Sequence, residues 1–244
     1  MENNERICDV GSTHRLIEDT RSLPFGTDAL LLAAAVRPCR GDIIELGAGS
    51  GVVSLLLAAR NKGHHIVAVE VRDDMAAILE RNIALNSLTG RVSALRCDLR
   101  ELPSDLNCSF AAVVANPPYM KADSGREGEN DASNASRREL AGTIFDFAAR
   151  ASKLLCFGGS FYCVYRPERM ADLFEAMRAS GCEPKRATMV YATKDHPPCL
   201  VIVEAKKGAK PSLAFSAPLF LQDEHGKESE EYKRIVESGY FINQ

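Results

Sequence analysis

Short apolar runs alternate with helical stretches along most of the chain, and this alternation constrains the fold more than any other feature. Parallel strands cannot be joined by a tight turn, so each needs a crossover segment, which is usually a helix. The pattern therefore predicts a mostly parallel sheet covered by helices. Seven runs are predicted as strands: 42–46, 65–69, 92–96, 111–115, 160–165, 186–191 and 199–205.

The last two predicted strands have no helical stretch between them, so they are expected to form an antiparallel hairpin at the end of the sheet. Elsewhere, apolar residues recur at helical spacing between the strands. Helices are predicted at 51–60, 73–85, 140–155 and 167–179. Residues 41–210 are expected to form the α/β domain, with an N-terminal extension at 1–40 and a C-terminal tail at 211–244.

The composition excludes several classes of protein. Thirty Lys and Arg against 33 Asp and Glu give the 244 residues a net charge of −3, so nucleic acid must be bound through a local patch. The longest apolar run, 29–36, is too short to span a membrane, and the first residues lack the pattern of a signal peptide. Eight cysteines without CxxC or CxxH spacing indicate reduced thiols in a cytoplasmic protein and no metal site.

A glycine-rich segment, ELGAGSG at residues 45–51, lies between a predicted buried strand and a predicted helix. Glycines there let the backbone turn sharply and approach a ligand closely. Glu70, nineteen residues past Gly51, ends the next strand, where a carboxylate can accept hydrogen bonds from ribose hydroxyls. A nicotinamide dehydrogenase would use a similar carboxylate, but its loop has GxGxxG spacing rather than GxGxG. The segment predicts a nucleotide-like ligand and leaves its identity open.

Two further strand ends narrow the chemistry. Asp98 follows the third predicted strand, where its carboxylate can accept from the exocyclic amine of an adenine, and NPPY at 116–119 follows the fourth. The Asn116 side-chain oxygen and the Pro117 carbonyl offer two acceptors for a planar amine with two N–H donors. Because ligands of open α/β sheets lie beyond the carboxyl ends of the strands, these residues are expected at one edge, here called the ligand rim.

Four segments carry a family resemblance: ELGAGSG at 45–51, VE at 69–70, CD at 97–98 and NPPY at 116–119. Their combination resembles the class I S-adenosylmethionine-dependent methyltransferases that act on planar amino groups. Three further segments are similar to the bacterial tRNA-valine (adenine-N6)-methyltransferase family: PFGTDALLLA at 24–33, SRREL at 136–140 and VYRPER at 164–169. The similarity extends over residues 14–235. It implies a Rossmann-like seven-stranded α/β fold, with a cofactor lid within residues 1–40 and the methyltransferase domain at 41–210.

The resemblance also implies a reaction: N6-methylation of adenine in tRNA, at position 37 beside the anticodon of a valine tRNA, with S-adenosylmethionine as cofactor. The residues implied in cofactor binding are Asp28, Glu45, Gly47, Gly49, Gly51, Glu70, Asp98 and Asn116. Asn116 and the Pro117 carbonyl would orient the amine for an in-line displacement, which needs no metal, and Tyr119 would stack on the base.

Other functions stay open at this point. A protein-glutamine N5-methyltransferase of the release-factor type also carries NPPY, because a glutamine amide is another planar amine. Such enzymes have a helical domain before the glycine loop, where about 40 residues stand here. A guanine-N2 methyltransferase acting on ribosomal RNA shares the chemistry. A nucleotide-binding scaffold without activity is the alternative outside enzymes, but it has no need for two acceptors aimed at an amine.

Basic residues are the candidates for RNA contact in this net acidic chain. Arg137 and Arg138 follow the polar loop after NPPY, near the expected substrate entrance. Lys206, Lys207 and Lys210 leave the last predicted strand and are expected beside the ligand rim. They form either a patch that faces phosphates or the ordinary solvated side of a hairpin.

Overall fold

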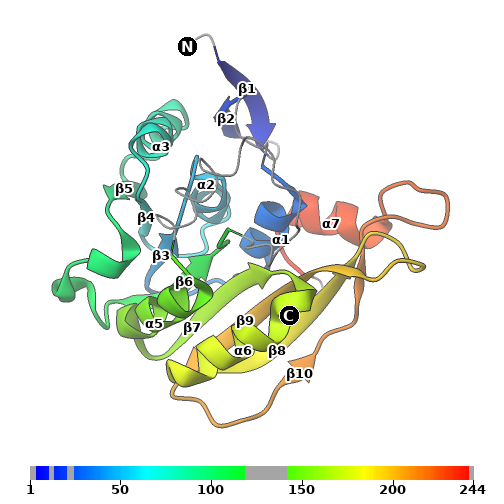
Figure 1. The fold of residues 1–244 in the computed structure, drawn as a ribbon. Helices are drawn as coiled ribbons and strands as arrows, with labels where there is room; N and C mark the ends of the chain where they lie inside the picture. Colours follow the sequence, from blue (N-terminus) through cyan, green and yellow to red (C-terminus); the bar gives the residue numbers. More distant parts are fainter. Residues whose placement is uncertain (1–3, 11–13, 21–24, 119–141, 242–244) are drawn as a thin grey trace, which may run out of the picture.

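One large sheet runs through the computed structural model, which describes residues 4–10, 14–20, 25–118 and 142–241 (Figure 1). Its seven long strands are β3 (Asp42–Leu46), β4 (Ile66–Glu70), β5 (Val92–Arg96), β6 (Phe110–Ala115), β7 (Leu155–Tyr165), β8 (Cys182–Tyr191) and β9 (Pro198–Lys207). Two short strands, β10 (Ala214–Phe215) and β11 (Leu219–Phe220), pair with β8.

The strand order is β10-β8-β9-β7-β6-β3-β4-β5. Neighbours from β7 to β5 are parallel, whereas β9 lies antiparallel between β7 and β8. The predicted sheet, mostly parallel with an antiparallel terminal hairpin, is therefore confirmed. The sequence pattern does not predict β10 and β11, because a strand of two residues has no apolar period.

Helices cover both faces of the sheet (Figure 1). On one face lie α1 (Thr27–Ala35), α2 (Val52–Ala59), α3 (Asp73–Leu85) and α7 (Glu230–Ser238), and on the other α5 (Ile144–Leu154) and α6 (Met170–Ala179). Each face has its own apolar core, and successive strand residues point to opposite cores. In β3, for example, Ile43 belongs to the core that includes α1, α2 and α3, and Ile44 belongs to the core that includes α5 and α6.

Helix α5 shows how local chemistry sets a boundary. Thr143 Oγ1 accepts a hydrogen bond from the Asp146 N–H, and the Asp146 carboxylate accepts one from the Thr143 N–H. This capping box starts the helix at Ile144 rather than at the predicted residue 140. The strand that follows begins at Leu155, five residues before its predicted start at 160.

The segments before and after the sheet pack on the apolar core that includes α1, α2 and α3. Strands β1 (Glu5–Val10) and β2 (His14–Asp19) form an antiparallel hairpin. Buried Asn82 of α3 ties β2 to the glycine loop, because its amide accepts from the Ile17 N–H and donates to the carbonyls of Ile17 and Ser50. At the other end of the chain, Tyr232 and Ile235 of α7 join the core beside α1.

None of the described helices has the length and apolar character needed to cross a membrane.

Candidate active site

The structure forms the ligand rim that the sequence predicts. Strands β3, β4, β5 and β6 are mutually parallel, so their carboxyl ends meet at one edge of the sheet. These ends deliver the glycine loop at 47–51, Glu70, Asp98 and Asn116. Residues that lie up to about seventy positions apart in the sequence are thereby brought to one site.

The glycine loop needs its glycines for conformation. The backbone angle φ is +73° at Gly47, +56° at Gly49 and +88° at Gly51, the left-handed region that residues with a Cβ rarely adopt. A Cβ on Gly51 would also collide with the Leu79 side chain of α3. Glycine at these positions therefore lets the chain turn from β3 into α2 while α2 packs closely on α3.

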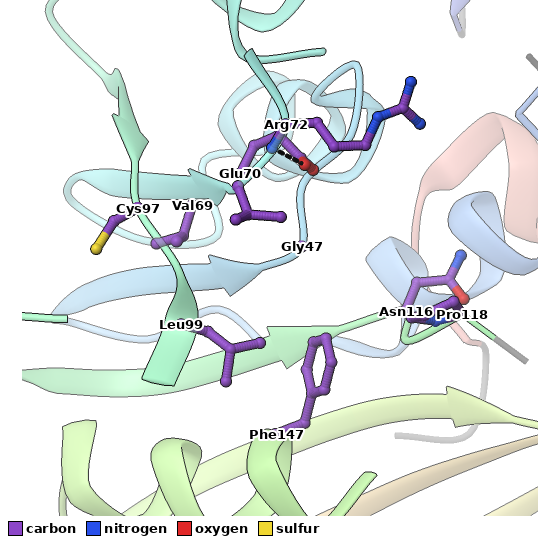
Figure 2. A pocket seen from close by; sticks show the side chains of 10 residues that line it. Gly47, Val69, Glu70, Arg72, Cys97, Leu99, Asn116, Pro118 and Phe147 are labelled. Atoms are coloured by element: carbon purple, nitrogen blue, oxygen red, sulfur yellow. Dashed lines mark hydrogen bonds between the residues drawn. The ribbon is translucent and has the colours of Figure 1, made fainter. Parts of the chain in front are cut away.

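Glu70 is held at the end of β4 by backbone groups of the rim. Its carboxylate oxygens accept from the N–H groups of Gly49 (2.7 Å) and Arg72 (2.8 Å), the second of which is drawn in Figure 2. Only 7% of the residue is exposed. Each carboxylate oxygen has more than one lone pair, so Glu70 can also accept from ligand hydroxyls. Its predicted contact with a ribose remains a prediction.

Two cavities of about 310 Å³ each lie at the rim and share Gly47 and Asn116 in their linings. Figure 2 shows the first, in which Val69, Leu99 and Phe147 supply apolar walls beside Glu70. Apolar walls beside a carboxylate fit a ligand in which a planar ring is attached to a group that carries hydroxyls. Acidic side chains prevail among the charged residues of the second cavity: Glu18, Asp19, Asp28 and Glu45.

Glu45, which lines the second cavity, is held in place by the first turn of α2. Its Oε2 accepts from the backbone N–H (2.9 Å) and the hydroxyl of Ser54, and 2% of the residue is exposed. Burial raises the pKa of the Glu45 carboxyl to about 8 from 4.5, although the hydrogen bonds from Ser54 oppose this shift. The carboxyl is therefore largely protonated at neutral pH, and a cationic ligand in the cavity would favour its ionisation.

We expect Glu45→Gln to flatten the dependence of folding stability on pH. The folded-state pKa is raised, so the folded protein binds the proton more tightly than the unfolded chain and loses stability as pH rises from about 4.5 to about 8. The slope approaches ~1.4 kcal/mol per pH unit inside this window. Glutamine keeps an oxygen acceptor for Ser54 and does not titrate.

The measurement is urea unfolding of wild type and variant between pH 5 and 9. Buried Lys62, whose pKa burial lowers to about 7 from 10.5, contributes the opposite trend at higher pH, but it is present in both proteins and cancels in their difference. A stability difference that does not change with pH would contradict the proposed protonation of Glu45.

Asn116 lies where the two cavities meet. Its Nδ2 donates to Oδ2 of Asp28 (3.1 Å), and Oδ1 of Asp28 accepts from the Ala29 N–H in the first turn of α1. Pro117 is buried, and Pro118 lines the first cavity. Tyr119 lies outside the described residues.

Asp98 stands at the rim but is engaged by a neighbour. It caps the 3-10 helix η1 (Leu99–Glu101) by accepting from the Arg100 N–H, and its carboxylate forms an ion pair with the Arg100 guanidinium. The hydrogen bonds from Arg100 lower the pKa of the Asp98 carboxyl. Cys97 and Leu99 line the first cavity, whereas Asp98 is absent from its lining. The predicted contact of Asp98 with an adenine amine remains a prediction.

Lys206 and Lys207 lie at the opposite end of the sheet from the ligand rim, so their expected placement beside the rim is wrong. The reason is the direction of β9, which runs antiparallel to β7. Val201 pairs with Tyr165 at the carboxyl end of β7, whereas Lys206 pairs with Ser160 near its start. Lys210 follows beyond that end of β9. Contact of these lysines with RNA remains a prediction for this distant face, and Arg137 and Arg138 lie outside the described residues.

Several residues of the site carry no motif. Phe147 of α5 and Leu99 of η1 form cavity walls, but in the sequence they look like any other core residues. Asn82 is different, because an asparagine stands where the helical period of α3 calls for an apolar side chain. A polar residue at an apolar position of the helical period could have marked Asn82 as structurally important from the sequence alone.

Within the described ranges, no group of three or more His, Cys, Asp and Glu side chains is placed to hold a metal ion.

The fold and the site together define a methyltransferase of the Rossmann-like class: a glycine loop after β3, an acidic residue ending β4 and Asn-Pro-Pro after β6. Comparison with known families agrees, since residues 20–178 match the methyltransferase small domain. The chain belongs to the methyltransferase small domain family. The predicted class of enzyme, a methyltransferase whose methyl donor is S-adenosylmethionine, is thereby confirmed.

Similar proteins extend over nearly the whole chain. A Parabacteroides distasonis protein named tRNA1(Val) (adenine(37)-N6)-methyltransferase is 28% identical, covering 91% of this chain and 92% of its own. A Klebsiella pneumoniae protein of the same name is 27% identical, covering 92% and 91%. A solved structure of a predicted O-methyltransferase from Agrobacterium tumefaciens superposes with a TM-score of 0.71 at 24% identity, covering 87% and 96%, and supports the fold alone.

Proposed function

We propose that this protein transfers the methyl group of S-adenosylmethionine to the N6 amine of an adenine in tRNA. The modified base is the adenosine at position 37, beside the anticodon of a valine tRNA, as the names of its relatives state for them. An anticodon-loop adenine can be unpaired, which lowers the free energy needed to bring it into a pocket. A tRNA substrate implies a cytoplasmic enzyme.

The observation that carries this proposal is Asn116 at the junction of the two cavities. An adenine N6 lone pair is delocalised into the ring, so the amine is a poor nucleophile. Hydrogen bonds from the amine to the Asn116 oxygen and the Pro117 carbonyl favour a pyramidal nitrogen whose lone pair is directed at the methyl group. Rate enhancement then comes from positioning and fixed polar groups. Tyr119 would add stacking on the base.

The described residues fit the proposed cofactor. The apolar slot of Val69, Leu99 and Phe147 suits its adenine, with Glu70 placed for its ribose. The acidic second cavity suits its ammonium group, and Glu45 and Asp28 are the carboxylates that would face this charge. The bound cofactor supplies a methyl group on a positively charged sulfur. Residues 1–40 are proposed to act in part as a lid, since Asp28 lines the cavity.

Methyl transfer from labelled S-adenosylmethionine tests the substrate directly. The purified protein is incubated in parallel with bulk tRNA, ribosomal RNA and a release factor, and the labelled product is digested and identified. N6-methyladenosine in tRNA is expected. Label in a glutamine side chain or in N2-methylguanosine would replace the proposal by one of the rival methyltransferase functions, and no transfer to any substrate would favour a binding scaffold.

Arg137 and Arg138 are proposed to contact RNA phosphates. Each lost contact should reduce the slope of log affinity against log salt by ~0.7–0.9, so Arg137→Ala/Arg138→Ala should flatten the plot by ~1.4–1.8. Cofactor affinity should not change, because the glycine loop and Glu70 are intact. The measurement is a filter-binding salt titration with tRNA, with Lys206→Ala/Lys207→Ala in parallel. An unaltered slope removes that pair from the interface, since exposed ion pairs within the protein contribute only ~0–1 kcal/mol.

A further inference from the structure

The hydrogen bond between Asp28 and Asn116 joins α1, which belongs to the N-terminal extension, to the end of β6. The two residues are 88 positions apart in the sequence, and both line the second cavity. We propose that Asp28 is a positioning residue, which sets the orientation of the Asn116 amide so that its oxygen faces the reacting amine. The inference rests on the proposed function and assigns a second residue to the same site.

The direction of the amide follows from the chemistry of its partner. An ionised carboxylate only accepts hydrogen bonds, so the Asn116 atom at 3.1 Å from Asp28 Oδ2 has to be the nitrogen. Nitrogen and oxygen stand on opposite sides of a planar amide, as Figure 2 shows for Asn116. The oxygen therefore points away from Asp28. The reversed amide would bring two oxygens together with no proton between them and would lose a charge-assisted hydrogen bond.

Orientation matters because the oxygen and the NH2 group of the amide have opposite effects on an amine. The oxygen accepts an N–H and leaves the nitrogen lone pair available. The NH2 side would instead donate to that lone pair and block the displacement. An asparagine without a fixed partner would spend part of its time in the blocking orientation.

Asp28 is itself held in place. Its Oδ1 accepts from the Ala29 N–H (2.8 Å), and the N-terminal turn of α1 favours a negative charge at this point. Gly26 leaves room for the carboxylate, since a Cβ there would lie 2.8 Å from Oδ1. The carboxylate is therefore ordered by the protein before any ligand binds.

Three variants test the inference: D28N, N116D and the double swap D28N/N116D. D28N removes the charge that fixes the amide and should lower turnover at saturating cofactor at least ~10-fold. Asp28 also lines the acidic second cavity, so cofactor affinity should fall as well, but by a smaller factor than turnover. N116D places two carboxylates against each other and should lower turnover at least ~100-fold. The double swap restores one donor and one acceptor in the pair, with an oxygen toward the amine, and should recover at least ~10-fold over N116D.

Turnover of D28N within twofold of wild type would overturn the inference. A double swap no more active than N116D would also overturn it. So would a loss of cofactor affinity in D28N as large as the loss of turnover, because Asp28 would then act through the cofactor.

A second measurement needs no substrate. In 15N spectra of asparagine side chains, one Asn116 amide proton should be shifted downfield and exchange slowly in wild type but not in D28N. An unchanged signal in D28N overturns the inference. Failure of wild type to methylate tRNA would refute the proposed function while these spectra still decide the orientation.

Discussion

Asn116→Ala is expected to lower turnover at least ~100-fold, equivalent to ~2.7 kcal/mol of transition-state stabilisation. The substitution removes the side-chain acceptor at the junction of the cavities and leaves the glycine loop, Glu70 and the apolar slot in place. Affinity for S-adenosylmethionine should therefore stay within a few-fold. Single-turnover methyl transfer to tRNA, with calorimetry of cofactor binding, measures both quantities.

Asn107→Ala is the matched control for this prediction, because Asn107 precedes the opposite end of the same strand, β6. It should leave turnover unchanged. Near-normal turnover of Asn116→Ala in a folded protein would refute a mechanism in which Asn116 orients the amine.

Glu70→Ala should weaken S-adenosylmethionine by ~5–150-fold, or ~1–3 kcal/mol, because ribose hydroxyls and two backbone N–H groups lose their acceptor. The backbone groups belong to Gly49 and Arg72, so part of the loss reflects a loosened glycine loop. Glu70→Gln keeps an oxygen for one of these N–H groups and should lose less affinity.

Isothermal titration of the purified variants gives the affinities, and Glu80→Ala, which removes an exposed carboxylate from α3, serves as control. An affinity of folded Glu70→Ala equal to that of wild type would show that this carboxylate does not contact the cofactor.

The sheet was predictable because its central strands, such as β3 and β6, are buried on both faces and its crossovers are amphipathic helices. A strand buried on both faces leaves a short, nearly continuous apolar run, as in Asp42–Leu46, and an amphipathic helix leaves apolar residues at helical spacing, as in Asp73–Leu85. The hairpin of β1 and β2 has no such signal, since seven of its twelve residues are charged or polar and only part of it is buried. Helix α7 is short, and only Tyr232 and Ile235 mark its buried side.

The placement of Gly51, Glu70 and Asn116 at one edge of the sheet was predictable, because each lies at or just after the carboxyl end of a parallel strand. It was not predictable where position depends on strand direction or on a partner. Lys206 ends a strand, but β9 runs antiparallel and carries it away from the rim. The pairing of Asp28 with Asn116 depends on how α1 packs against β6, which no local pattern encodes.

The most direct test of the proposed function is mass spectrometry of tRNA from a strain that lacks this gene. Valine tRNA is isolated from deletion and parent strains and cut with a nuclease, and the anticodon-loop fragment is weighed and sequenced. The proposed function predicts that N6-methyladenosine at position 37 is absent from the deletion strain and returns when the wild-type gene, but not Asn116→Ala, is restored. Undiminished N6-methyladenosine at that position in the deletion strain would contradict it.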